Sequence, residues 1–220
     1  MTPGADEDHR RPAQTDRHRR TDTRASDGVE SNARITGATG AVLLVLLAAE
    51  GITILRIRGL LWAHVFIGML LIPPVLLKMG TTSYRMVRYY LGSPAYRRKG
   101  PPPVLFRLLG PLVVVLTVVV LASGVALLLT PPHWRSALLL LHKASFVLWF
   151  GVMAIHVLGH LADTARLAPL DWIRSTRRSV AGAGWRTWTI AFSLVAGILL
   201  GLLVTTQVNG WLTATHHLRH

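Results

Sequence analysis

The chain has 220 residues, of which 51% are hydrophobic, with no cysteine and a formal net charge of +14. The lack of cysteine excludes disulfides, thiolate metal sites, iron–sulfur clusters and covalent haem attachment. A charge this basic would indicate nucleic-acid binding in a soluble protein. Here the basic residues alternate with long apolar runs, so we expect a membrane protein with no nucleic-acid partner.

Five apolar segments approach the length that crosses a bilayer. A transmembrane helix needs about 20 consecutive, mostly apolar residues. The segments are residues 36–55, 60–77, 108–129, 136–161 and 188–208. Because a single chain segment in lipid can satisfy its own backbone only as a helix, they predict an all-α, polytopic membrane protein with five transmembrane helices.

The predicted spans divide the chain into five parts. Residues 1–34 balance seven acidic residues against seven arginines and lack large apolar side chains, so we expect a disordered cytoplasmic tail. The remaining divisions are a four-helix transmembrane core over 35–165, a cytoplasmic connection over 166–187, a fifth transmembrane helix over 188–210, and a short external tail over 211–220.

Basic residues are distributed unequally between the two ends of the spans. The N-terminal tail and the second and fourth connections hold 19 Lys and Arg residues, against four in the first and third loops and the C-terminus. The positive-inside rule then predicts an N-terminus in the cytoplasm and a C-terminus outside. Arginine greatly outnumbers lysine, as is typical of GC-rich bacterial genes, so we expect a bacterial cytoplasmic membrane.

Three further patterns concern the helices. Pro73 and Pro74 predict a kink in the second span. Residues 83–91 mix aromatic and basic side chains, which indicates a helix lying on the cytoplasmic surface, against lipid headgroups rather than the alternative of a partner protein. Gly197 and Gly201 form a small-residue repeat that favours close helix packing.

Two histidines stand at similar depth in the predicted spans. His64 and His142 lie early in the second and fourth spans, which run in the same direction because one span separates them. If these helices are neighbours, the two imidazoles can face each other across the bundle interior, as cofactor ligands do in helix bundles.

The fourth span carries two more histidines on the face of His142. His156 follows by 14 residues, about 40° short of four full turns, and His160 follows by 18, which is five turns. The rise of about 1.5 Å per residue places His156 about 21 Å from His142, which suits the opposite side of a membrane.

A pair of imidazoles from two helices suits the two axial positions of a b-type haem, whose iron would then pass electrons. On these positions, His64, His142 and His156, the chain resembles bacterial cytochrome b561 and the cytochrome b subunits of formate dehydrogenase and nickel–iron hydrogenase. The resemblance covers roughly residues 35–165 and implies a b561-like four-helix core. It implies an outer haem held by His64 and His142, and His156 in a second, inner haem site.

The first span departs from the family pattern because it contains no histidine to pair with His156. Met79 is an alternative ligand at that depth, but we expect no inner haem, with His156 and His160 as hydrogen-bonded interior groups. For His64 and His142 the alternatives to haem are a structural pair, another metal ion or a proton relay.

Other polar and aromatic residues bear on the outer pair. Glu50 and Lys143 lie at similar depth, so an ion pair would lower the cost of both charges in lipid. Lys143 could instead contact a haem propionate, or extend its amine to the outer surface. Trp149 and Phe150 could pack on a porphyrin or belong to the core.

The sequence therefore predicts a membrane electron-transfer protein with one haem b, exchanging electrons with a quinone or a partner redox protein. No nucleophile or nucleotide-binding loop is recognisable, so any enzymatic role is that of a redox subunit. The alternative is a haem-free multi-pass protein, either a proton-coupled transporter or a scaffold subunit.

Overall fold

The protein is all-helical in the computed structural model, which describes residues 10–98, 104–171 and 182–217. Helix α1 spans Arg10–Leu55, α2 Ile57–Tyr90, α3 Pro94–Arg98, α4 Val104–Leu129, α5 Arg135–Leu167 and α7 Ala183–His217. Two 3₁₀ turns, Pro132–Trp134 and Ala168–Asp171, flank α5. No strand occurs in these described ranges.

Five of the helices contain a segment long and apolar enough to cross a membrane. These segments are Asp27–Leu55, Ile57–Tyr90, Arg107–Leu129, Arg135–Leu161 and Ala183–Thr206. Many large apolar side chains on them are exposed, including Val45, Val115 and Phe192. An apolar outer surface of this kind fits lipid rather than water, so the chain is a multi-pass membrane protein.

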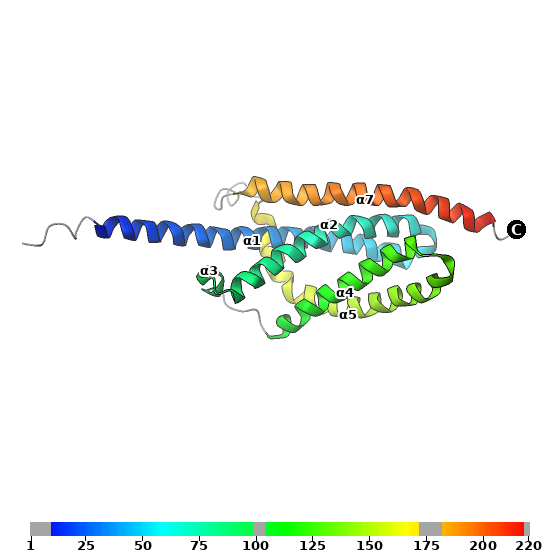
Figure 1. Ribbon diagram of the computed structural model, residues 1–220, viewed down its shortest axis with the longest axis horizontal. Coiled ribbons are helices and arrows are strands. Elements are labelled where there is room, and N and C mark those ends of the chain that lie inside the picture. The colour runs from blue at the N-terminus through cyan, green and yellow to red at the C-terminus, as the bar shows by residue number, and fades with distance from the viewer. Residues whose placement is uncertain (1–9, 99–103, 172–181, 218–220) are drawn as a thin grey trace, which may run out of the picture.

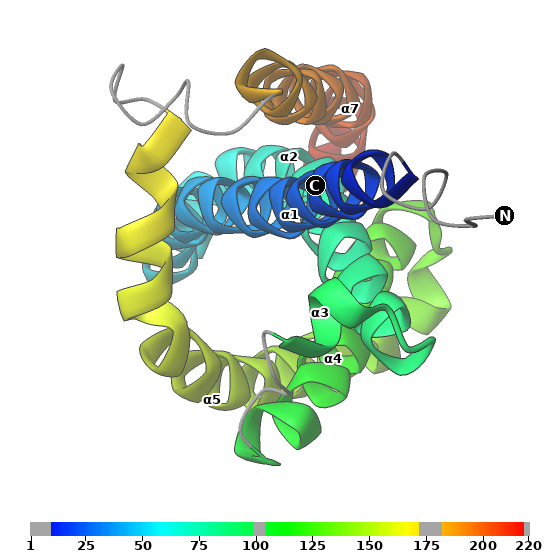
Figure 2. The same cartoon turned by 90° about the vertical axis from the view of Figure 1, so that its left-hand side faces the viewer.

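The five long helices run side by side and alternate in direction, with the two chain ends at opposite ends of the bundle (Figure 1). Helix α2 packs against α1 on one side and α7 on another, and α4 packs against α5 as a hairpin. Viewed along the helices, α5 and α4 lie opposite the group formed by α1, α2 and α7 (Figure 2). Contacts of α1 with α5 and of α2 with α4 join the two groups.

The predicted close contact at the glycine repeat of α7 is confirmed. A Cβ atom added at Gly197 would lie 2.5 Å from the backbone oxygen of Leu70, and one added at Gly201 would lie 2.8 Å from the ring of Phe66. Both contacts are on α2. The glycines therefore let the two helix backbones approach more closely than any larger residue would permit.

The N-terminal region differs from the disordered tail that we expected for residues 1–34. Helix α1 begins at Arg10, and residues 1–9 lie outside the described ranges. A helix that extends from an existing span needs no new nucleation. Its segment before the membrane is also held by packing: Arg186, only 1% exposed, donates to the hydroxyl of Ser31 over 3.0 Å, and Asn32 donates to the backbone oxygen of Thr81 over 3.1 Å.

Helix α2 also differs from its prediction at both ends. Its non-helical dihedral angles are at Leu60, whereas the helix continues through Pro73 and the buried Pro74, where we had expected the kink. Residues 83–91 are not a separate surface helix, because α2 runs on to Tyr90. Gly92, whose φ is +85°, follows the end of the helix. Helix α3 then packs back, with the ring centres of Tyr84 and Tyr96 6.1 Å apart.

Candidate cofactor site

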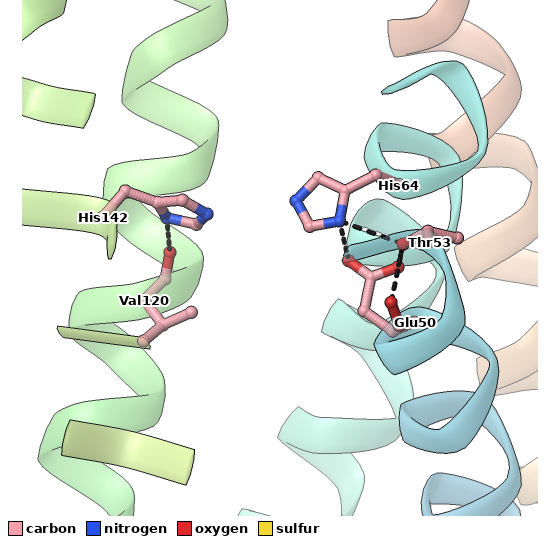
Figure 3. A network of polar contacts seen from close by, with 5 residues as sticks. All are labelled: Glu50, Thr53, His64, Val120 and His142. Carbon is pink, nitrogen blue, oxygen red and sulfur yellow. Dashed lines mark hydrogen bonds and ion pairs between the residues drawn. The ribbon is translucent and has the colours of Figure 1, made fainter. Parts of the chain in front are cut away.

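The structure brings His64 of α2 and His142 of α5 together, as their matching depth had predicted. Their ring centres are 6.3 Å apart and their planes are inclined at 75°. Each histidine comes from a different helix group, so the pair bridges the interior between α2 and the α4–α5 hairpin (Figure 3).

Helix α1 supplies the partners of His64. The Nδ1 atom of His64 lies 2.8 Å from the carboxylate of Glu50 and 3.2 Å from the hydroxyl of Thr53. The Thr53 hydroxyl itself donates to the backbone oxygen of Glu50 over 2.6 Å. An ionised carboxylate can only accept, so the proton of a neutral His64 imidazole belongs on Nδ1 and its lone pair on Nε2.

Helix α4 orients His142 in the same way, with neutral partners. The Nδ1 atom of His142 lies 3.1 Å from the backbone oxygen of Val120 and 3.0 Å from the hydroxyl of Ser123. A carbonyl oxygen can only accept, so Nδ1 donates and Nε2 again holds the lone pair. A Cβ atom at Gly124 would come within 3.2 Å of the His142 ring, so this glycine provides the space that the ring occupies.

The two Nε2 atoms are consequently acceptors that face each other. Figure 3 shows the second ring nitrogen of each histidine directed across the gap toward the other ring. Two opposed lone pairs in a membrane interior gain nothing from each other, but both gain from an electrophile between them. Donation of the far nitrogen to a carboxylate or a backbone carbonyl is also the arrangement that metal-ligating histidines typically adopt.

The spacing fits two imidazoles on one metal ion. With metal–nitrogen bonds of about 2 Å and ring nitrogens about 1 Å from the ring centre, the centres of two axial imidazoles lie about 6 Å apart. No cluster of three or more His, Cys, Asp or Glu residues suitable for a metal occurs among the described residues. Two ligands leave a bare zinc ion short of its usual four, whereas a haem brings four nitrogens of its own. The residues present therefore fit a haem better than a bare ion.

Of the alternatives considered for Lys143, the ion pair with Glu50 does not form, because Glu50 contacts His64 and Lys143 is exposed. Lys143 follows His142 by one residue and is therefore turned about 100° around the helix from it. Trp149 belongs to the packing between helices, since its indole nitrogen donates to the hydroxyl of Thr117 on α4 over 2.8 Å. Phe150 is 61% exposed, on the outer surface of α5.

The second pair of histidines lies apart from this site. The rings of His156 and His160 are 4.8 Å apart, at the end of α5 where Lys78 of α2 also lies. The amine of Lys78 donates to the backbone oxygen of Thr36 over 2.7 Å and lies 2.8 Å from a Cβ position on Gly40. Helix α1 thus presents a carbonyl and a glycine at this depth, where the family pattern has a histidine.

Sequence reasoning did not identify Thr53, Val120, Ser123 or Gly124 as parts of the site. A local signal existed for two of them: Thr53 is one helical turn from Glu50, and Ser123 is one of two hydroxyl residues, with Thr117, in an otherwise apolar span. The contribution of Val120 is a backbone oxygen, for which the sequence carries no signal.

No known protein family, curated protein or solved structure matches this chain, so the site has to be interpreted from its own geometry.

Proposed function

We propose that this protein is a membrane electron-transfer cytochrome that holds one b-type haem between His64 and His142. The observation that carries the proposal is the pair itself: opposed Nε2 atoms on rings whose centres are 6.3 Å apart. The four helices that supply the ligands and their partners, α1, α2, α4 and α5, would form a core like that of bacterial cytochrome b561.

The chain's own residues determine what such a haem can do. A bound haem supplies one-electron redox chemistry. With His64 and His142 both holding its iron, the haem would have no free position for a substrate, and its role would be electron transfer rather than catalysis at the metal. Glu50 and Val120 hold the two rings in the tautomer with Nε2 available. A quinone or a partner redox protein would exchange the electrons.

The distribution of basic residues supports an N-terminus inside and a C-terminus outside, and the excess of arginine over lysine supports a bacterial cytoplasmic membrane. Helix α1 reaches the proposed site near its outer end, because Glu50 and Thr53 are among its last six residues. The haem would then lie toward the outer leaflet.

The test is haem content after removal of each ligand. We expect purified His64→Ala and His142→Ala proteins to lose most of the haem that the wild-type protein retains, since one imidazole alone holds the iron weakly. His133→Ala is the matched control. This histidine is exposed near the start of α5, and its ring contacts Trp134 rather than His64 or His142. Equal haem in all four proteins would contradict the proposal. No haem in the wild-type protein, with haem supplied during expression, would favour a haem-free transporter or scaffold.

A further inference from the structure

The two histidines of the site differ in the charge of the group that contacts their Nδ1 atoms. The Nδ1 atom of His64 faces the carboxylate of Glu50, whereas that of His142 faces a neutral carbonyl and a hydroxyl. The Glu50 side chain is only 13% exposed. It is also the one acidic residue within the five apolar segments of the sequence. An intramembrane carboxylate is costly, so its position against a proposed ligand calls for a functional explanation.

We propose that Glu50 is a positioning residue that lowers the reduction potential of the haem by holding His64 and giving its imidazole partial anionic character. The inference rests on the proposed function of the site. Hydrogen bonds from ligating histidines to carboxylates increase the basicity of the ligand. A more basic ligand stabilises the ferric iron more than the ferrous iron, because the ferric form carries the greater positive charge.

Electrostatics acts in the same direction. Reduction adds an electron to the haem without moving the carboxylate, so the negative charge of Glu50 opposes that step. The apolar surroundings of the span screen this interaction less than water would. Lys143 does not neutralise the Glu50 carboxylate, because its side chain is exposed on α5 and Glu50 contacts His64 instead.

Glu50→Gln tests this directly, because glutamine keeps an oxygen that can accept from Nδ1 while it removes the negative charge and replaces the second carboxylate oxygen by an amide group. The measurement is a redox titration of the purified, haem-loaded protein, followed optically. At a fixed ambient potential we expect the ratio of reduced to oxidised haem to rise at least tenfold, which is about 59 mV for a one-electron couple. Lys143→Gln, which removes a charge outside the site, should change the ratio less than threefold.

The outcomes separate this inference from the proposed function. If Glu50→Gln binds haem and its ratio of reduced to oxidised haem equals that of the wild-type protein, the role of Glu50 is overturned and the haem site remains supported. The same holds if Lys143→Gln changes this ratio as much as Glu50→Gln does. If Glu50→Gln loses its haem, Glu50→Asp decides: restored haem supports a role of the charge in holding His64, and equal loss contradicts it. A wild-type protein without haem would overturn both proposals.

Discussion

Replacing Gly197 by alanine should loosen the contact between α7 and α2. The added Cβ atom would lie 2.5 Å from the backbone oxygen of Leu70, whereas ordinary contact begins near 3.4 Å, so the helices would have to separate locally by 0.9 Å. A backbone atom inside a helix cannot turn aside as a side chain can. Overpacking of this kind costs about 1–3 kcal/mol, and the better helix propensity of alanine returns about 1 kcal/mol.

Gly151→Ala is the matched control for that substitution. Gly151 lies in the middle of α5 and an added Cβ atom there would meet nothing within 4 Å, so the variant gains the propensity without the clash. We therefore expect Gly197→Ala to be about 1–3 kcal/mol less stable than Gly151→Ala, measured by reversible unfolding in mixed detergent micelles. Equal stability of the two variants would refute the close packing of α7 on α2.

Four other predictions follow from the fold and the site. Deleting residues 2–26 should leave folding and haem content unchanged, whereas deleting 2–34 should lower the thermal midpoint, because it removes the partners of Arg186 and Thr81; equal midpoints would contradict this. A reporter active only in the cytoplasm should work when fused after residue 178 and fail after residue 220, and the reverse would invert the topology. His156→Ala and His160→Ala should keep the wild-type haem content, and loss of half would reveal a second haem. If haem is bound as proposed, the ferric protein should give a strongly anisotropic low-spin electron paramagnetic resonance signal, because the ring planes of His64 and His142 are inclined at 75°; a signal typical of parallel planes would contradict the ring geometry.

The number and direction of the long helices could be predicted from sequence, because apolar runs of bilayer length leave few structural options. The equal depth of His64 and His142 on parallel helices also followed from spacing and alternation of direction, which the sequence contains. That the two rings face each other was predicted only on condition that their helices lie close together, which the sequence does not show.

The partners of the two histidines depend instead on how helices are rotated and which of them touch. The sequence placed two candidate partners of Glu50, Lys143 and His64, at comparable depth. Only the rotation of α5 in the structure shows that Lys143 faces outward and that Glu50 contacts His64. The oxygen of Val120 has no side-chain signature. The length of α1 was not predicted for a different reason. Composition predicted disorder, and the residues that Ser31 and Asn32 contact on other helices are far away in sequence.

Whether a haem lies between His64 and His142, as we claim, can be decided with an optical spectrum of the purified wild-type protein. The protein should be expressed with a haem precursor and its spectrum recorded oxidised and then reduced with dithionite. We expect the sharp bands of a six-coordinate b-type haem, one haem per chain, and no change on adding carbon monoxide, because the two histidines would leave the iron no free position. A spectrum without haem bands would contradict the claim, and a reduced form that binds carbon monoxide would contradict the assignment of two histidine ligands.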